Sequence, residues 1–199
     1  ASPAPASEAR VIAHWESQLK PQRQPGLSSV NYATSHISHA VESMTVTPKT
    51  PEQIEGMRVA GRLAAEVLEM IAPMIEVGMT TGEIDRICHD YIVNVQKAIP
   101  APLNYHGFPR SICTSINDVI CHGIPSDSKK LKNGDIINVD VTVIKDGWHG
   151  DTSIMLGVGD VPQHAERLML ITQECLYKAL AIVKPGTTLG DIGHTIQEH

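Results

Sequence analysis

Residues 136–157 read IINVDVTVIKDGWHGDTSIMLG, and this stretch decides the fold. Every second residue of its first half is apolar: Ile137, Val139, Val141 and Val143. A period of two places these apolar side chains on one face of a β-strand. Asp140 therefore lies on the opposite, polar face of the same strand.

A turn follows this strand and sends the chain back alongside it. Lys145, Asp146 and Gly147 are typical of a hairpin turn, and residues 148–156 form the returning strand. We expect Asp140 and Asp151 nearly opposite each other, within about one register step, as in a three-residue loop with a bulge. Two carboxylates this close both stay ionised only with a cation between them; otherwise one pKa rises. The pattern predicts a metal site, with an edge pair or turn-capping residues as the alternative interpretation.

The composition indicates one domain of ordinary size, or a smaller domain with tails. The chain has 199 residues, of which 42% are hydrophobic and only 4% aromatic, so we expect a mostly aliphatic core. A net charge of -6 disfavours a surface that binds nucleic acid or an anionic membrane. The basic cluster Lys129, Lys130 and Lys132 is interpreted as a solvated turn. No apolar run approaches the roughly 20 residues that span a bilayer.

The cysteines Cys88, Cys113, Cys121 and Cys175 show neither a CxxC pair nor zinc-ribbon spacing. A chain of this length does not need disulfides for stability. We therefore expect reduced thiols and a cytoplasmic location. Cys113 and Cys121 are interpreted as core thiols close to the proposed site.

The first 43 residues differ in composition from the rest. Ala, Ser, Pro and Gln dominate segments such as ASPAPASEAR at 1–10, which predicts a flexible tail or linker. A targeting sequence is the alternative, but Glu8, Glu16 and Glu42 are unusual in an acid-poor transit peptide. Met44 begins the segment with helix signals and is a candidate for the native start. We expect residues 44–199 to form the folded part.

Helix signals surround the predicted sheet. Two capping boxes, Thr50 to Gln53 and Thr80 to Glu83, each predict the start of a helix, and Pro51 occupies a first helical position. The expected elements are helices from 51 to about 75, from 81, over 164–183 and from 189, and a short strand pair over 110–117 and 119–122. Together these elements predict an α+β fold.

One segment recurs within the chain. Residues 78–84 read GMTTGEI and residues 186–192 read GTTLGDI, each between a long helix and a second one. Shared helix-start chemistry explains one such match as well as duplication does. The long helix before each copy favours duplication. The second half would then begin again with two helices, and its strands would lie beyond His199.

Several blocks resemble the N-terminal half of type I methionine aminopeptidases, in their bacterial-like form, within the pita-bread metallopeptidase family. The blocks are KTPEQIEGMRVAGRLAAEVLEMI (49–71), NYHGFPRS (104–111), VICHGIP (119–125), NVDVTVIKDGWHGDTS (138–153) and VKPGTTLGDIG (183–193). The resemblance implies a curved antiparallel sheet with helices on its outer face, whose C-terminal part is absent from this chain. Residues 44–199 would then be an incomplete catalytic domain, the first half plus the start of the second.

The resemblance also implies roles for particular residues. Asp140 and Asp151 match the family's first two metal ligands, and Asp151 matches the one whose carboxylate bridges both ions. His122 matches a histidine that contacts the substrate and assists the leaving amine; a histidine satisfied by neighbouring backbone is the alternative. His149 is either a donor to the bridging carboxylate or a turn residue. The methionine side-chain pocket would include Tyr105, His106, Phe108 and Cys113, with Pro102 where the family often has Cys.

The implied cofactors are two divalent metal ions, and oxygen-rich ligands do not select among Co, Mn, Fe and Zn. One further His and two Glu ligands, and a second pocket histidine, are expected beyond His199. The implied reaction is removal of the N-terminal methionine from nascent proteins by metal-activated hydroxide attack on the first peptide bond. The implied partners are nascent polypeptides, with a transient ribosome encounter. The full-length protein would be a cytoplasmic monomer.

Two other functions stay open at this point. One is a non-catalytic binding module on the same fold, which facing carboxylates disfavour. The other is an Xaa-Pro-type aminopeptidase of the same fold, which the methionine-pocket blocks disfavour. We expect this chain alone to be inactive. Because an incomplete sheet exposes apolar edges, we also expect it to be poorly soluble or dimeric.

Overall fold

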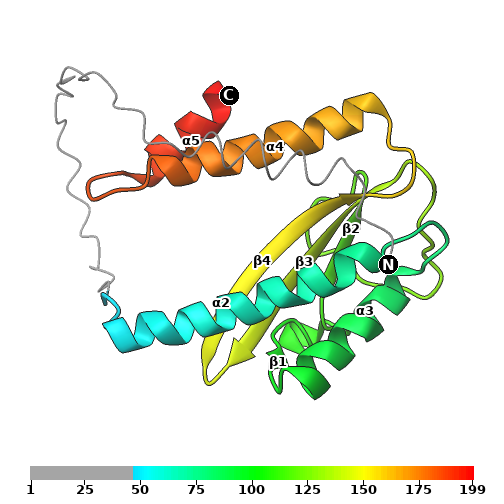
Figure 1. The fold of residues 1–199 in the computed structure, drawn as a ribbon, viewed down its shortest axis with the longest axis horizontal. Coiled ribbons are helices and arrows are strands. Elements are labelled where there is room, and N and C mark those ends of the chain that lie inside the picture. Colours follow the sequence, from blue (N-terminus) through cyan, green and yellow to red (C-terminus); the bar gives the residue numbers. More distant parts are fainter. Residues whose placement is uncertain (1–46) are drawn as a thin grey trace, which may run out of the picture. The chain divides into compact units, whose positions relative to one another are not determined.

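The computed structural model describes residues 47–199, which form one compact unit. The expected tail at 1–43 and the candidate start at Met44 lie outside the described residues. The helices are α2 (Pro51–Ile71), α3 (Thr81–Asp90), α4 (Gln163–Ala181) and α5 (Leu189–Glu198), and the strands are β1 (Ile99–Pro100), β2 (Cys113–Ile116), β3 (Ile136–Lys145) and β4 (Trp148–Gly157) (Figure 1). Short helical segments are η1 (Ala72–Met74), η2 (Tyr91–Val95) and η3 (Tyr105–Gly107). The α+β class predicted from the sequence is confirmed.

β3 is the central strand of an antiparallel sheet (Figure 1). β4 pairs with one edge of β3 over its whole length. β1 and β2 share the other edge, where β1 pairs with Val143 and Ile144 and β2 pairs with residues 137–140. The loop that joins β1 to β2 therefore runs along this edge, beside residues 140–143.

The hairpin turn is shorter than the sequence pattern indicated. Lys145 pairs with Trp148, so Asp146 and Gly147 alone form the turn, with φ angles of 50° and 83°. Positive φ at both positions is the type I′ geometry, which matches the natural twist of paired strands. The prediction of a three-residue loop with a bulge was wrong.

This turn sets the offset between the two aspartates. Asp151 pairs with Thr142, and Asp140 pairs with Ser153. The aspartates are therefore two register positions apart, and the predicted offset of about one step was wrong because the turn contains no bulge. An offset of two keeps both side chains on the same face of the sheet, since the alternation has a period of two. Diagonal neighbours of this kind lie about 7–8 Å apart.

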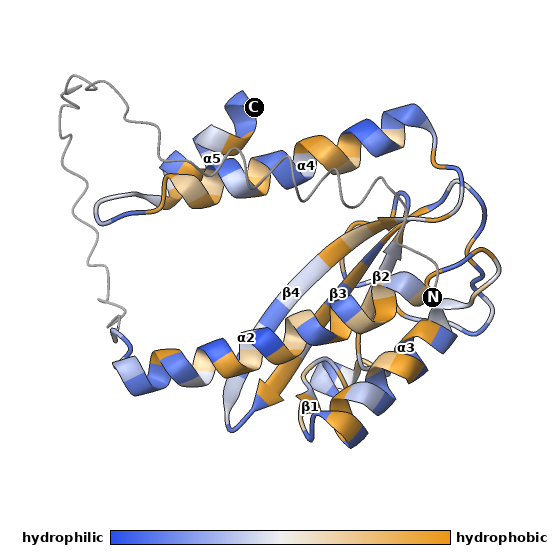
Figure 2. Ribbon diagram, viewed as in Figure 1, coloured by the Kyte–Doolittle hydropathy of each residue, from blue (hydrophilic) through white to orange (hydrophobic). Residues whose placement is uncertain are grey.

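The hydrophobic core lies between the apolar face of β3 and the two helices α2 and α3. The fully buried residues of this layer include Ala64, Val67, Ile71, Ile84, Cys88, Val139, Val141 and Val143. Hydrophobic and hydrophilic residues alternate along α2, as expected of a helix with one buried face (Figure 2). Full burial of a Val or Leu side chain contributes about 1.5–3 kcal/mol. α2 and α3 thus cover one face of the sheet. The opposite face, which carries Asp140, is not covered by these two helices.

The helix starts follow the predicted capping chemistry. The backbone N–H of Thr50 donates to Gln53 Oε1 at 2.9 Å, and that of Thr80 donates to Glu83 Oε2 at 2.7 Å. Each threonine hydroxyl accepts the return bond from the residue three positions on. The helical stretch that begins at Pro51 ends with η1 at Met74, close to the predicted end.

The two copies of the recurring segment fold alike. Gly78 and Gly186 have φ angles of 92° and 95°, and each precedes a capping threonine. The backbone N–H of Thr188 donates to Asp191 at 2.7 Å, as Thr80 does to Glu83. A long helix precedes each copy and a helix of 10 residues follows it. The similarity thus extends over the whole helix pair, which supports duplication over shared capping chemistry alone.

The second helix pair exposes much of its apolar surface. In α4 the only buried residue is Ala179, whereas Leu168, Leu176 and Leu180 are each more than half exposed. α5 packs on α4, where His199 lies 2.7 Å from Glu174. No helix in the described part of the chain is long and apolar enough to cross a membrane. Poor solubility or self-association of this chain stays a prediction, which these exposed leucines support.

Candidate active site

Asp140 and Asp151 lie on the face of the hairpin that faces away from α2. Asp140 is half-buried and Asp151 is exposed. His149 precedes Asp151 by two residues and so lies on the same face, opposite Ile144. The strand alternation therefore places two carboxylates and an imidazole on one open surface.

The pKa of Asp140 is raised above its usual value. Burial is the largest cause, and the negative charge of Asp151 adds to it, whereas His122 acts in the opposite direction. The three side chains are thus close enough for their charges to interact. Ionisation of both carboxylates is therefore opposed by their mutual repulsion, and a bound cation would reduce that repulsion.

His122 lies in a loop whose backbone is strained. Cys121 and His122 have φ angles of 59° and 53°, which non-glycine residues seldom adopt. Such conformations cost on the order of 1–3 kcal/mol each and persist only where the surroundings impose them. The predicted strand at 119–122 was therefore wrong, because a left-handed backbone cannot continue a strand. Strain of this kind is concentrated at functional sites.

β2 holds this strained loop in place through Gly123. The backbone N–H of Gly123 donates to Ser115 Oγ at 3.2 Å, and its carbonyl accepts from the N–H of Thr114 at 2.8 Å. A Cβ on Gly123 would lie 2.8 Å from the carbonyl carbon of Thr114, closer than real Cβ contacts allow. The close approach that glycine permits thus fixes the residue next to His122. The sequence reasoning missed Ser115 and Gly123.

Cys113 pairs directly with Asp140 across the two strands. Burial, followed by the charges of Asp140 and Asp151, raises its pKa to about 11. Cys113 is therefore a protonated thiol at neutral pH and a poor nucleophile. The interpretation as a core thiol is confirmed for Cys113, which is buried, but was wrong for Cys121, which is exposed on the strained loop.

The loop between β1 and β2 carries the residues expected to bind the methionine side chain. It begins where the N–H of Ala101 donates to the carbonyl of Thr142 at 2.9 Å. Tyr105 and His106 pack edge to face with ring centroids 4.4 Å apart, and Tyr105 is 69% exposed. Phe108 is half-buried. The two ends of this loop pair with β3 at residues 140–144, so its backbone connects to the strand that carries Asp140.

A close helix contact fixes the position of β4 next to Asp151. Gly150 lies directly beneath α2, and a Cβ there would lie 2.5 Å from the backbone nitrogen of Gly61 and would also overlap the carbonyl group of Ala60. Gly56 makes a similar approach to the ring of Trp148. Only glycine, which has no Cβ, allows the helix and the strand to approach each other this closely. Gly150 was not identified from the sequence, since one glycine in a strand gives no indication of its partner.

One known protein family accounts for most of this chain. Residues 55–199 match metallopeptidase family M24. The chain belongs to this family. Membership of M24 implies the use of divalent metal ions, as the sequence predicted.

The chain is similar to bacterial methionine aminopeptidases over most of its length. It is 64% identical to methionine aminopeptidase of Escherichia coli strain K12 over 155 residues, 78% of this chain and 59% of that protein. The crystal structure of methionine aminopeptidase from Rickettsia prowazekii matches with a TM-score of 0.75 and 52% identity, covering 77% of this chain and 61% of that one. The chain thus spans about three-fifths of the relatives it matches.

A more distant structure shares the fold alone. X-Pro aminopeptidase from Thermotoga maritima matches with a TM-score of 0.64 at 21% identity, over 75% of this chain and 40% of that one. These matches confirm the predicted pita-bread fold, with its antiparallel sheet and covering helices. The resemblance to the N-terminal half of a bacterial-like methionine aminopeptidase is confirmed as well.

Asp140 and Asp151 offer hard oxygen donors for a metal ion, but too few of them. Carboxylate oxygens suit divalent cations, and the raised pKa of Asp140 beside Asp151 fits a place where a cation would bind. Among the described residues, no group of three or more His, Cys, Asp and Glu side chains converges on one point. The residues present fit a metal ion in part, and further ligands would have to come from elsewhere.

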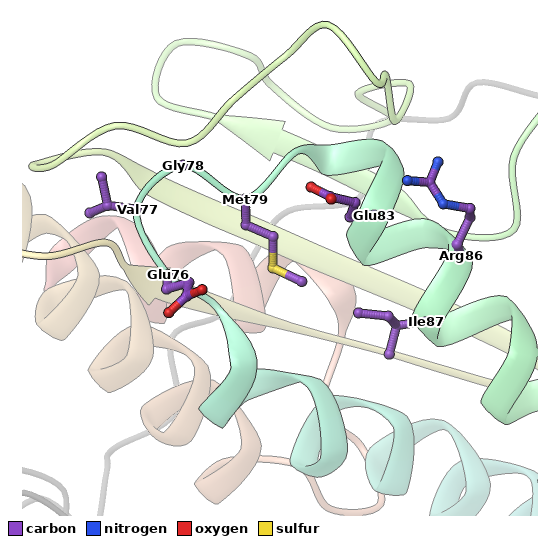
Figure 3. A pocket seen from close by; sticks show the side chains of 7 residues that line it. All are labelled: Glu76, Val77, Gly78, Met79, Glu83, Arg86 and Ile87. Atoms are coloured by element: carbon purple, nitrogen blue, oxygen red, sulfur yellow. The ribbon is translucent and has the colours of Figure 1, made fainter.

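A separate hollow of about 510 Å³ lies between the end of η1 and α3 (Figure 3). Of its three charged groups, Glu83 caps α3, Arg86 binds Asp127, and Glu76 is the third. The remaining lining is largely apolar, from Val77, Met79 and Ile87. None of the predicted site residues lines this hollow, so its size does not make it the candidate active site.

Proposed function

We propose that this chain is the first half of the catalytic domain of a metal-dependent methionine aminopeptidase. The whole enzyme would remove the N-terminal methionine from nascent proteins. The observation that carries the proposal is the placement of Asp140 and Asp151 on one open face of the hairpin, in a chain 64% identical to the E. coli relative. Residues 44–199 would form this part of the domain, with residues 1–43 as a flexible tail.

Asp140 and Asp151 would hold the metal ions. Their oxygen donors suit two divalent ions of Co, Mn, Fe or Zn, with one His and two Glu ligands supplied from outside the described residues. Bound there, the ions supply Lewis acidity at the scissile carbonyl and a nucleophile at neutral pH. Asp151, the more exposed of the two, is the carboxylate expected to bridge both ions.

His122 would act on the substrate directly. Its side chain is exposed, and its charge lowers the pKa of Asp140, which supports a position near the proposed metal ligands. From there the imidazole would donate a hydrogen bond near the scissile bond and assist departure of the amine. The strained backbone, held by Thr114 and Ser115 through Gly123, would keep the imidazole in that orientation.

The loop between β1 and β2, together with the first residue of β2, would bind the methionine side chain. Tyr105, His106, Phe108 and Cys113 would line an apolar pocket for the thioether. Because its pKa is raised to about 11, Cys113 would contribute shape without charge. Discrimination against shorter side chains in such pockets is worth about 1–3 kcal/mol per methylene.

The partners and location follow from this proposed substrate. Nascent polypeptides that begin with methionine would be the main partners, met in a transient encounter near the ribosome. The full-length protein would be a cytoplasmic monomer. The net charge of -6 supports an encounter through the polypeptide, without a nucleic-acid surface on this chain.

Methionine release by the full-length polypeptide that contains this chain tests the proposal. With Mn or Co added, we expect release from a Met-Ala-Ser peptide, and its loss in Asp140→Asn and Asp151→Asn. Asp146→Asn is the matched control, since Asp146 is an exposed aspartate in the same hairpin and Asn-Gly also favours a type I′ turn. Equal activity of all the variants would refute the proposed ligands.

A panel of peptides and a metal titration separate the two alternatives. An Xaa-Pro-type aminopeptidase would release residues preferentially before proline in a panel of peptides. A non-catalytic binding module would release nothing and would bind metal no better than Asp140→Asn in a calorimetric titration. The isolated chain is expected to be inactive, and release of methionine by it near the full-length rate would contradict the need for further ligands.

A further inference from the structure

A buried carboxylate on α3 lies outside the groups assigned so far. Asp85 is only 5% exposed, in the middle of the helix. A buried charge is costly unless hydrogen bonds and opposite charges compensate it. Its Oδ1 accepts the backbone N–H groups of Ser111 at 2.8 Å and Ile112 at 3.1 Å. Its Oδ2 lies 3.7 Å from Nη1 of Arg110.

All three partners of Asp85 are consecutive residues at one end of the candidate pocket loop. A second side chain of α3 contacts the same segment, because His89 Nδ1 lies 2.7 Å from Ser111 Oγ. Asp85 and His89 are four residues apart and therefore lie on one face of the helix. α3 thus fixes residues 110–112 through both backbone and side-chain groups.

This segment joins two parts of the proposed active site. Before it lies the loop with Tyr105 and Phe108, whose other end is fixed where Ala101 donates to Thr142. After it lies β2, which begins with Cys113 opposite Asp140. A displacement of residues 110–112 would therefore move the pocket loop relative to the aspartates.

The loop that carries His122 is connected to the same point. Arg110 Nη2 lies 3.6 Å from Asp127, which also pairs with Arg86 of α3. One residue earlier, the carbonyl of Ser126 accepts the backbone N–H of Gly82 at 3.1 Å. α3 therefore holds the pocket loop and the far end of the His122 loop together, with Arg110 between them.

We propose that Asp85 is a positioning residue that sets the pocket loop at residues 105–112 relative to Asp140, and thereby sets the selectivity for methionine. The proposal rests on the proposed function, since it concerns selectivity at the same site. Asp85 touches no reacting group; it acts through the backbone of Ser111 and Ile112 and through Arg110. Side-chain selectivity should therefore depend on Asp85 more than the chemical step does.

Three variants of the full-length polypeptide separate this role from simple folding. Asp85→Ala removes every acceptor and leaves two buried N–H groups unpaired. Asp85→Asn keeps one oxygen acceptor for those N–H groups but removes the charge opposite Arg110. Asp90→Asn is the matched control, because Asp90 is an exposed aspartate of the same helix. Its Oδ1 accepts a hydrogen bond from Asn94 Nδ2 at 2.6 Å, so its contact is local.

Kinetics on Met-Ala-Ser and Leu-Ala-Ser peptides provide the first measurement. For Asp85→Ala we expect KM for the methionine peptide to rise about tenfold or more with kcat within about threefold, and the preference for methionine over leucine to fall. Asp85→Asn should recover most of that preference, and Asp90→Asn should match the unmodified protein. Loss of kcat by the same factor on both peptides, with the preference unchanged, would indicate instability alone and would overturn the proposal. Unchanged KM and preference in Asp85→Ala would overturn it as well.

Amide hydrogen exchange provides a second measurement that does not need activity. In Asp85→Ala, peptides that cover residues 105–113 should exchange faster, while those from the hairpin at 136–157 keep their protection. Unchanged exchange at 105–113 would overturn the proposal. If Asp85→Ala fails to fold, exchange at 105–113 is compared between Asp85→Asn, which removes the charge opposite Arg110, and Asp90→Asn: faster exchange in Asp85→Asn supports the proposal, and equal exchange overturns it. If the unmodified protein releases no methionine, the proposed function fails, and exchange still decides whether Asp85 positions the loop.

Discussion

The contact between Gly150 and α2 allows a sharp prediction about stability. In Gly150→Ala the new methyl group would lie 2.5 Å from the backbone nitrogen of Gly61 and would overlap the carbonyl of Ala60. These are helix backbone atoms, so no side-chain rotation relieves the overlap. Overpacking of a well-packed site costs about 1–3 kcal/mol, and we expect the upper end of that range.

The neighbouring Gly61→Ala provides the opposite result as a control. Its added Cβ would meet nothing within 4 Å, and the position is inside a helix. Replacing such a glycine by alanine stabilises a helix by about 0.5–1 kcal/mol. Two substitutions of the same kind, on either side of one contact, should therefore change the free energy of unfolding in opposite directions.

Urea unfolding of the full-length polypeptide, followed by circular dichroism, measures both effects. A cost of about 3 kcal/mol is a large share of the 5–15 kcal/mol typical of a domain and lowers Tm by about 6–12 °C at this size. The slope m should stay constant, since the surface exposed on unfolding does not change. A loss below about 0.5 kcal/mol for Gly150→Ala would refute the close contact.

Three further predictions concern thiols and helix caps. Burial raises the pKa of Cys88 to about 12 and that of Cys113 to about 11, so both thiols should resist alkylation by iodoacetamide at pH 8. Cys121 is exposed and should react first. Mass spectrometry of the native protein checks this order. Thr80→Ala and Thr188→Ala should each lower the free energy of unfolding by about 1 kcal/mol, because each removes the hydroxyl of a capping box. A loss in Thr80→Ala alone would show that α5 is not part of the unit that unfolds cooperatively. The hydrogen bonds from Thr188 lower the pKa of Asp191 below 3.8. The ionised Asp191 carboxylate therefore stabilises the fold above pH 3.8, and this stabilisation declines as the pH falls through the lowered pKa. In Asp191→Asn this acid dependence should be absent from an unfolding titration.

The hairpin was predictable from the sequence because its signals are local. Alternation along 136–145 determined the face of Asp140, and period-two geometry placed Asp151 on the same face. The turn type was also encoded, since Asp146-Gly147 is a strong two-residue turn signal, but a longer loop was expected in its place. That single misjudgement produced the error in register.

The strained loop at His122 and the buried Asp85 were beyond sequence reasoning. Left-handed backbone at a histidine has no local signal, because contacts with Thr114 and Ser115 impose it from outside the loop. Asp85 precedes its partners Ser111 and Ile112 by more than 20 residues, and helical periodicity does not reveal which polar residue is buried. Both features depend on tertiary contacts that join distant segments.

The second helix pair shows a different limit. Its two helices and the cap at Thr188 follow from local signals and formed as predicted. The apolar residues of α4 remain exposed, however, although the same periodicity in α2 leads to burial against β3 and β4. Helical patterning thus predicts which face a helix offers and gives no information on the partner that covers it.

Calorimetric titration of Mn or Co into the full-length polypeptide tests the central claim most directly, namely that Asp140 and Asp151 hold divalent metal ions. Affinity should fall at least about tenfold in Asp140→Asn and in Asp151→Asn, while Asp146→Asn binds like the unmodified protein. Equal affinity in all four proteins would contradict this claim, because the two carboxylates would then share one face of the sheet without serving as ligands.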